Sequence, residues 1–233
     1  MVTAVETATW APGTLLAALG GADREALLRL GPSRAFGAGE SLICEGAPGR
    51  AAYLLLRGCT KVLGSGAGGR AVLLSIRVAG DLVGELAALD GKPRSASVVA
   101  ATPTVARVIA HAALLAFLED RPGATRAVHA AVVAELRRAT RHRLDAHAGP
   151  ATARLALIIG HLADAYGTVR GDGTHIEVPL SQPELASLAG MSEPTVHRAL
   201  AELRVREIVR TGYRQLVVSD PEALRDVAGR RGA

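Results

Sequence analysis

The segment GDLVGELAALDGKPRSASVVA, residues 80–100, brings together residue types that can hold a small anionic ligand. Arg94 carries a guanidinium group, which pairs with a phosphate through parallel N–H donors. Ser95 adds a hydroxyl and a backbone N–H, and Glu85 supplies a carboxylate that accepts a hydrogen bond from a ribose hydroxyl. Gly84 allows close packing directly before that carboxylate. These four residues are therefore a candidate binding site for a sugar phosphate.

The same residues also allow an interpretation without a ligand. An Arg and a Glu held inside an apolar barrel are unfavourable unless a ligand or a partner satisfies them. An internal Arg94–Glu85 ion pair would satisfy both groups. The sequence leaves the two interpretations open.

A second group of polar residues lies in LSQPELASLAGMSEPTVHRALAELRVREIV, residues 180–209. Ser181 is a candidate N-cap, and Glu184 three residues later completes a capping box. Gly190 suits the tight turn between two crossed helices, and Ser192 is the N-cap expected for the second helix. The pattern predicts a helix-turn-helix motif.

The segment IVRTGYRQLVV, residues 208–218, follows this motif and predicts a β-hairpin wing with its turn at Thr211-Gly212. In winged helix-turn-helix motifs the second helix enters the major groove of DNA, with its N-terminal residues at the base edges. The predicted DNA-contacting residues are the polar side chains of that helix: Ser192, Glu193, Thr195, His197 and Arg198.

These five side chains suit different contacts. Arg198 is the candidate for a bidentate contact to guanine, worth about 1–3 kcal/mol of discrimination. Thr195 suits a phosphate contact, and Ser192 presents the helix N-terminus to the DNA backbone. Glu193 either accepts from a cytosine amine or stabilises the helix dipole. His197 either contacts DNA or is simply exposed.

The elements around these sites fall into three parts. Residues 14–30 have the spacing of two short helices joined by a turn, and residues 33–118 alternate short β-prone runs with Gly-rich turns. Strands spaced in this way predict a β-sandwich or barrel. Residues 124–148 predict one long helix. The expected fold class is α+β: a jelly-roll-like sandwich, a long helix and a C-terminal winged helix-turn-helix.

The long helix carries a narrow apolar stripe. Its members Val132, Leu136, Ala139 and Leu144 share one face, a pattern typical of the seam between two helices, and Val132, Leu136 and Ala139 are the predicted dimer contacts. Packing of this stripe against the sandwich of the same chain is the alternative. Gly149-Pro150 ends the helix and is the candidate hinge.

These patterns divide the chain into three predicted regions. Residues 1–123 form the sandwich that senses a ligand, and residues 124–149 form the long dimerisation helix and hinge. Residues 150–233 form the winged helix-turn-helix domain that binds DNA.

The charge of the chain is unevenly distributed. The 233 residues carry a formal charge of +5, from 27 Lys and Arg against 22 Asp and Glu. Residues 1–149 hold 17 basic and 12 acidic residues, whereas residues 150–233 hold 10 of each. The second part would therefore bind DNA through a few placed arginines. The basic stretch 137–143 could face solvent, DNA backbone or ligand.

Composition sets further limits on the class of protein. With 49% hydrophobic and 21% charged residues the chain is not mainly disordered. It has no apolar run long enough to span a membrane and no secretory signal, so we expect a cytoplasmic protein without a membrane partner. Two separated cysteines, Cys44 and Cys59, exclude an iron–sulfur cluster, and neither a haem nor a metal is expected.

Together the two motifs resemble those of the CRP/FNR family of bacterial transcription regulators, over essentially the whole chain. GELAALDGKPRSA, residues 84–96, is similar to the phosphate-binding cassette of cyclic-nucleotide-binding domains. The resemblance implies that Gly84 and Glu85 hold a ribose and that Arg94 and Ser95 hold a cyclic phosphate. The order of sandwich, long helix and winged helix is also the order of the family.

The resemblance also implies an effector. Members that bind cyclic AMP place a Thr-Ser pair in the long helix against adenine, and that pair corresponds to Ala139 and Thr140 here, so Thr140 is the remaining candidate. The implied effector is a cyclic nucleotide, cyclic AMP first. The basic stretch 137–143 leaves a cyclic dinucleotide as an alternative.

The recognition helix departs from the cyclic-AMP-type pattern. That pattern begins Ser-Arg-Glu-Thr-Val, whereas here residues 192–196 are Ser-Glu-Pro-Thr-Val, with Arg198 kept. We therefore expect a different half-site within an operator that remains two-fold symmetric.

The expected function is that of a homodimeric, ligand-responsive transcription regulator whose partners are double-stranded DNA and RNA polymerase. Three rivals stay open: a regulator that binds DNA without a ligand, a cyclic-nucleotide hydrolase, and a nucleotide-binding module that does not bind DNA. The chain is not expected to be an enzyme, because its seven His show no metal-type spacing beside carboxylates.

Overall fold

The computed structural model describes residues 10–66, 69–145 and 149–229, except for the side chains of His142, Arg143 and Asp145. The end of the predicted long helix at 146–148 and part of the basic stretch 137–143 therefore lie outside the described residues. The chain divides into two compact units, residues 1–136 and 137–233. Each unit is described by itself.

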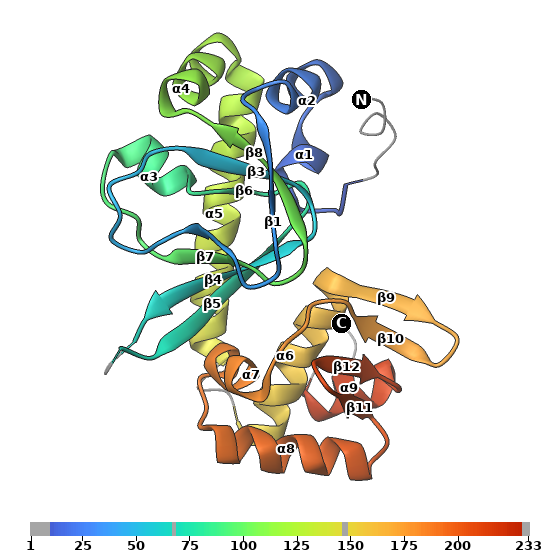
Figure 1. Cartoon of the computed structure of the whole chain (residues 1–233). Helices are drawn as coiled ribbons and strands as arrows, with labels where there is room; N and C mark the ends of the chain where they lie inside the picture. The colour runs from blue at the N-terminus through green and yellow to red at the C-terminus, as the bar shows by residue number, and fades with distance from the viewer. Residues whose placement is uncertain (1–9, 67–68, 146–148, 230–233) are drawn as a thin grey trace. The chain divides into compact units, whose positions relative to one another are not determined.

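The first unit is built on two antiparallel four-stranded sheets (Figure 1). One sheet has the order β1-β8-β3-β6, from Ser33–Phe36, Thr104–Ile109, Ala52–Arg57 and Leu82–Val83. The other has the order β2-β7-β4-β5, from Ser41–Ile43, Ser97–Ala100, Cys59–Ser65 and Ala71–Val78. The predicted jelly-roll-like sandwich is confirmed.

An apolar core fills the space between the two sheets. Its buried members come from strands of both sheets: Phe36, Leu42, Ile43, Leu55, Val83, Val98, Ala100 and Ala106. The edge of the Phe36 ring meets the ring of Tyr53, with centroids 6.2 Å apart. The sandwich therefore has an apolar interior, against which any charged group stands out.

Helices cover one side of the sandwich. The predicted pair of short helices is present as α1, Leu15–Ala18, and α2, Gly21–Leu28, and they pack with α4, His111–Asp120, in a second apolar cluster. One further helix, α3, Glu85–Asp90, interrupts the segment that carries the candidate ligand site. It was not predicted, because six residues are too few for a helical period.

The long helix α5 spans Pro122–Asp145. Ala124 and Val128 in its first turns are buried in the cluster that covers the sandwich. Further along, Val133 is 48%, Leu136 66% and Leu144 68% exposed. The start of the helix therefore packs against its own sandwich, whereas these three apolar side chains further along it are exposed.

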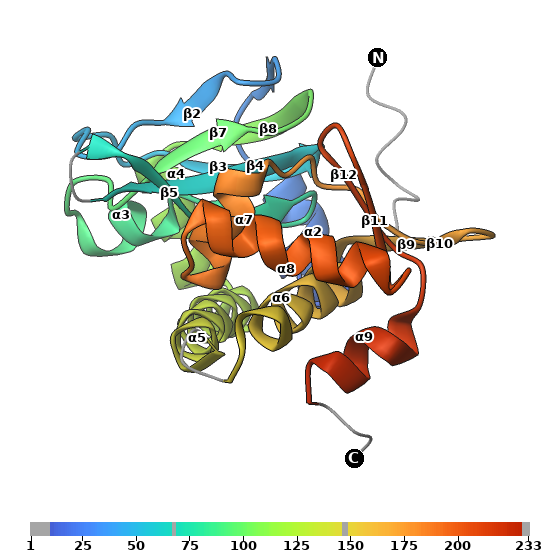
Figure 2. The ribbon, with the colours of Figure 1, turned by 90° about the horizontal axis from the view of Figure 1, so that it is seen from below.

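The second unit is a small helical domain with one sheet. Its helices are α6, Ala151–Tyr166, α7, Gln182–Ala189, α8, Glu193–Val205, and α9, Pro221–Val227. Helices α8 and α9 pack on α6 (Figure 2). The strands follow the order β11-β12-β10-β9, from Val209–Gly212, Gln215–Val218, Gly173–Ile176 and Gly167–Arg170. The winged helix-turn-helix is present.

Two details of this unit correct the sequence prediction. Gly212 pairs with Gln215, so the turn of the wing lies at Tyr213-Arg214 and not at Thr211-Gly212. Arg214 itself takes the positive φ of 53° that a glycine was expected to supply. Strand β9 was also missed, because all four of its residues are exposed and no alternation marks it.

The two lysines of the chain lie in contrasting places. Lys61 on β4 is only 8% exposed, whereas Lys92, just after α3, is exposed.

No helix among the described residues is both long and apolar enough to cross a bilayer.

Candidate functional site

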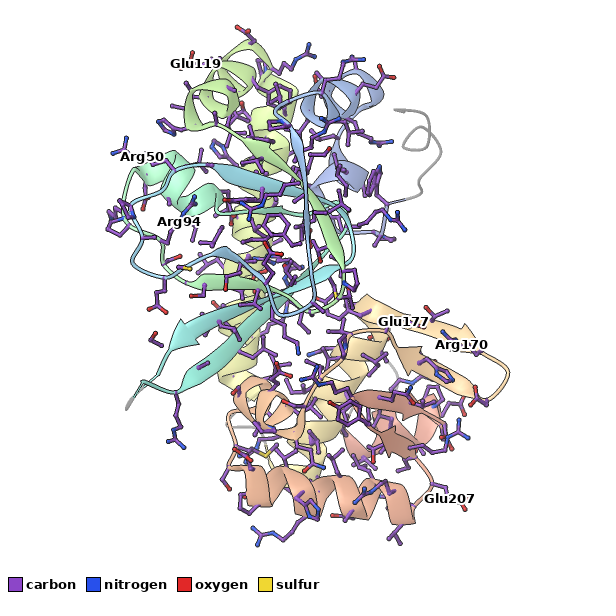
Figure 3. The ribbon with its side chains drawn as sticks, viewed as in Figure 1. Arg50, Arg94, Glu119, Arg170, Glu177 and Glu207 are labelled. Carbon is purple, nitrogen blue, oxygen red and sulfur yellow. The ribbon has the colours of Figure 1, made fainter. Side chains whose placement is uncertain are left out.

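Arg94 lies inside the first unit, next to α3 (Figure 3). The residue is 6% exposed, and its guanidinium donates from Nη1 to the carbonyl oxygen of Gly84 at 2.9 Å and from Nη2 to that of Ala51 at 2.5 Å. Burial lowers the pKa of Arg94, while Tyr53 and Glu85 oppose this shift. The group is thus a buried cation held by neutral acceptors.

No carboxylate lies within ion-pair distance of Arg94 in the part of the chain that the structure describes. The internal Arg94–Glu85 ion pair considered from the sequence is therefore not formed. Backbone carbonyls take the place of the carboxylate, and they leave the positive charge without a counter-charge. Such a site favours an anion.

The residues around Arg94 fix its backbone and pack closely against its side chain. Its N–H donates to the carbonyl of Ala47 at 3.1 Å, and its own carbonyl accepts from the N–H of Gly46 at 2.8 Å. Gly84, at φ +78°, approaches so closely that a Cβ there would lie 2.6 Å from Nη1 of Arg94. Gly84 is therefore required for space and for backbone conformation. Ser95 follows on the exposed side.

Glu85 is the first residue of α3 and is half-buried. Burial raises the pKa of its carboxyl, and the carboxylates of Glu135 and Asp81 act in the same direction. The Arg77 guanidinium and the backbone at the start of α3 oppose the shift. The structure thus joins Arg94 to Gly84, and Glu85 follows Gly84 at the start of α3. Their role in holding a ligand stays a prediction.

Two charged residues that the sequence analysis missed act electrostatically on Glu85. Arg77 on β5 and Glu135 on α5 form an ion pair with 2.6 Å between Nη1 and Oε2, and their side chains are 11% and 26% exposed. Their separation of 58 positions in the chain hid the pairing from sequence inspection. The one feature of the sequence that could have indicated the pair is the position of Arg77 at the end of an apolar strand.

The remaining candidates on α5 are half-buried or exposed. Val132 is half-buried, while Leu136, Ala139 and Thr140 lie on the surface of the helix. Ala139 and Thr140 belong to the second unit and Arg94 to the first, so the role of Thr140 in ligand binding stays a prediction. Gly149, with φ +68°, and Pro150, the N-cap of α6, form the link between α5 and α6.

In the second unit, the caps of the helix-turn-helix differ from each other. Ser181 and Glu184 form the predicted capping box at the start of α7, and Gly190 ends that helix in the left-handed conformation. Ser192 occupies the N-cap position of α8, but its hydroxyl pairs with the Thr195 hydroxyl at 2.8 Å and caps no N–H. The predicted side-chain cap at Ser192 is therefore wrong.

The predicted DNA-contacting side chains lie at the start of α8. Glu193, His197 and Arg198 are exposed, as is Ser192, and Thr195 is half-buried. Val196 and Leu200 on the opposite face are buried in the core of the unit. The helix therefore has one face fixed in the domain and one polar face available to DNA.

Basic residues of α8 and of the wing contact nearby side chains. Arg204 donates to the hydroxyl of Thr211 at 3.1 Å, and Arg210 pairs with Asp172, whose other oxygen meets His175. The Arg214 guanidinium lies 5.7 Å from the centre of the Tyr213 ring. These contacts fix the wing beside α8.

Among the described residues, no group of three His, Cys, Asp or Glu side chains is placed to hold a metal.

Family models match both units. A cyclic nucleotide-binding domain matches residues 33–121, and a Crp-like helix-turn-helix domain matches residues 153–227. The first match includes the Arg94 site, and the second includes α7, α8 and the wing.

Relatives are similar over most of the chain. A CRP-like cAMP-activated global transcriptional regulator of Mycobacterium tuberculosis is 31% identical over 189 residues, which is 81% of this chain and 84% of the relative. A cyclic AMP receptor protein of Thermus thermophilus is 28% identical over 195 residues, 84% of this chain and 87% of the relative. The structure of a CRP-family transcriptional regulator from Thermus thermophilus matches with a TM-score of 0.72 and 26% identity, and the match covers 84% of this chain and 96% of that one.

Proposed function

The chain belongs to the CRP/FNR family of transcription regulators, and from that premise we propose that it is a homodimer whose affinity for DNA depends on a cyclic nucleotide bound in the sandwich. The ligand is held by Gly84, Glu85, Arg94 and Ser95. The operator is two-fold symmetric, and RNA polymerase is the further partner of the complex.

The observation that supports the ligand site is the burial and hydrogen bonding of the Arg94 guanidinium. Its guanidinium is buried and uses two of its five N–H groups on carbonyl oxygens. A cyclic phosphate is an anion of suitable size for the remaining donors, and the Ser95 hydroxyl on the exposed side adds another. The Glu85 carboxyl is the acceptor for the ribose hydroxyl.

The identity of the base is a separate question. Cyclic AMP and cyclic GMP share the phosphate and the ribose, so the four residues named above do not choose between them. The relative from Mycobacterium tuberculosis is named for activation by cyclic AMP, which makes cyclic AMP the reference ligand. A cyclic dinucleotide is the larger alternative.

Dimerisation is supported by exposed apolar side chains on α5, of which Leu136 and Leu144 belong to the predicted stripe. Val133, Leu136 and Leu144 are about half to two-thirds exposed, although long apolar side chains are usually covered. A second copy of α5 would cover them in a two-helix seam. Ala139 and Val132 extend the same seam.

The proposed mechanism is a change in the separation of two recognition helices. The ligand binds beside α5, the Gly149-Pro150 link passes the change to the second unit, and the two α8 helices move relative to each other. Both must match major grooves about 34–36 Å apart on one face of DNA. The ligand shifts this equilibrium only through its different affinity for the two states.

The test combines two measurements on the full chain. Cyclic nucleotides that bind the native state raise its melting temperature by mass action, and fluorescence anisotropy with DNA enriched from a random pool measures the change in DNA affinity. We expect a nucleotide to raise the melting temperature and to change DNA affinity in the same concentration range. DNA binding that is unchanged by every nucleotide would identify a ligand-independent regulator instead.

A further inference from the structure

We propose that the Arg77–Glu135 ion pair fixes the rotation of α5 on the sandwich and thereby couples nucleotide binding to DNA binding. The two side chains are positioning residues, which act through α5 and do not contact the nucleotide. This inference rests on the proposed function, because it names the contact through which the sandwich acts on α5. Both residues belong to the first unit.

The buried face of α5 changes its character along the helix. Ala124 and Val128 are buried in the apolar cluster that covers the sandwich. Glu135 follows Val128 after about two turns of the helix, so the two residues share one face. Val133 and Leu136 are exposed, whereas the Glu135 side chain is only 26% exposed. A carboxylate therefore occupies a position at which the pattern of the helix predicts an apolar residue.

The contact made by Glu135 is directional. Its Oε2 accepts a hydrogen bond of 2.6 Å from Nη1 of Arg77, whose side chain is 11% exposed. Charge-assisted hydrogen bonds have a preferred distance and angle, whereas apolar contacts are non-directional and allow a helix to turn. The pair therefore determines which face of α5 meets the sandwich, and Val133 and Leu136 remain exposed.

Arg77 belongs to the wall of the sandwich interior. It lies opposite Thr60 on β4, and Thr60 in turn lies opposite Ala100 on β7. Directly opposed residues of antiparallel strands project from the same face of a sheet, and Ala100 is buried in the core between the two sheets. The side chain of Arg77 therefore leaves β5 on the inner face of its sheet.

The proposed nucleotide site borders the same interior. A Cβ on Gly84 would lie 2.6 Å from Nη1 of Arg94 and 2.7 Å from Cδ1 of Ile43, a residue of the core between the sheets. Ile43 lies on β2, in the same sheet as β5. A nucleotide held by Arg94 would therefore lie against this sheet. Any displacement of β5 that accompanies binding moves Arg77, and the ion pair passes the displacement to Glu135 on α5.

A purely structural role is the alternative. A buried ion pair is often no more stabilising than apolar residues of similar volume, because removing both charges from water is costly. The best-attested use of such groups is to fix one arrangement of packed elements. The first unit ends at Leu136, directly after Glu135, so the pair holds α5 where the helix leaves that unit. A movement of the sandwich reaches the rest of α5 through this point.

The test measures coupling and stability separately. Fluorescence anisotropy gives the DNA affinity of the full chain with and without saturating cyclic AMP, cyclic GMP or cyclic di-GMP, and the ratio of the two affinities is the coupling. The variant Arg77→Met with Glu135→Gln removes both charges but keeps the length of the two side chains. We expect its ratio to fall about fivefold or more toward one, while calorimetry shows that the nucleotide still binds.

Two further variants separate positioning from stability. Arg77→Glu with Glu135→Arg exchanges the charges and should restore the ratio, because the pair forms again with reversed polarity. Arg34→Met with Glu40→Gln is the matched control, since it removes an exposed ion pair of the same unit, with 3.1 Å between Nη2 and Oε1. The control should keep the ratio of the parent. If the first variant does not fold, Glu135→Gln alone supplies the comparison, because it removes the charge and keeps an acceptor for Arg77.

A failure of the inference and a failure of the proposed function give different results. A parent whose DNA affinity responds to a nucleotide, with the same ratio in the first variant, would overturn the inference and leave the proposed function standing. A lower melting temperature with an unchanged ratio would identify a structural pair, and a loss that the exchanged charges do not restore would also overturn the inference. A parent whose DNA affinity no nucleotide changes would overturn both.

Discussion

Nη1 of Arg94 donates a hydrogen bond of 2.9 Å to the carbonyl of Gly84, and a Cβ on Gly84 would lie 2.6 Å from that same nitrogen. The guanidinium thus occupies the space that a side chain at residue 84 would need. The Arg94 guanidinium can keep this position only while residue 84 is a glycine.

Gly84→Ala should destabilise the first unit by about 1–3 kcal/mol, because it combines a positive φ with contacts to Arg94 and to Ile43. It should also weaken nucleotide binding, since Arg94 must move. Gly39→Ala is the matched control, because Gly39 has a φ of +87° but open space around its Cβ. Thermal unfolding with and without nucleotide measures both effects, and equal losses in the two variants would show that the close approach to Arg94 is unimportant.

Arg94→Met should raise the dissociation constant of the nucleotide at least tenfold, since it removes the buried cation proposed to hold the phosphate. The stability of the ligand-free chain should change by no more than about 1 kcal/mol, because two lost hydrogen bonds are offset by one less buried charge. Arg50→Met removes an exposed arginine from the same end of the sandwich (Figure 3) and serves as the control. Calorimetry measures the nucleotide affinity of both variants, and an unchanged affinity in the Arg94 variant would exclude Arg94 from the nucleotide site.

Glu85→Gln should change how stability depends on pH. The pKa of Glu85 is raised above its ordinary value of 4.5, so the folded chain binds the proton more tightly than the unfolded chain. Its contribution is fully present below pH about 4.5 and is lost as the pH rises through the raised pKa. The glutamine variant should therefore lose less stability than the parent over that rise in pH. Denaturant titrations at several pH values measure the difference, and parallel curves would contradict the shift.

Ser181→Ala should destabilise the start of α7 by about 1 kcal/mol, because the hydroxyl caps the N–H of Glu184. Ser192→Ala should cost less than about 0.5 kcal/mol, because the Ser192 hydroxyl is bonded to Thr195 and not to a helix N–H. Hydrogen exchange of the α7 and α8 amides compares the two variants directly. A larger loss at Ser192 would mean that its hydroxyl caps α8 in solution.

Arg198→Ala should lower the discrimination at one base position of each half-site by about 1–3 kcal/mol. The reason is that Arg198 is exposed on the polar face of α8, opposite the buried Leu200. Arg225→Ala removes the same charge from α9 of the same unit and should leave specificity unchanged. Selection from random DNA measures base preferences, and an equal loss on all sequences would indicate a phosphate contact instead.

The parts of the fold that sequence inspection predicted well are those fixed by neighbouring residues. The capping box at Ser181 and the bounds of α9 depend on residues within one helical turn. The order of sandwich, long helix and winged helix followed from changes in hydrophobic period, which persist over many residues.

The missed features depend on contacts that are distant in the chain or on residues without a marked pattern. The Arg77–Glu135 pair joins a strand to a helix 58 residues later, and neither residue is unusual in its own segment. The wing turn was misplaced because glycine usually supplies a positive φ, whereas here Arg214 does so and Gly212 stays in the strand.

The contrast between the two lysines gives the protein a practical advantage for spectroscopy. Lys61 is 8% exposed, so of the two lysine side chains it is the exposed Lys92, two residues before Arg94, that an amine-directed dye would label. A fluorophore attached there would sit beside the phosphate position without any engineered cysteine. Ligand arrival could then be followed in real time on an otherwise unaltered chain.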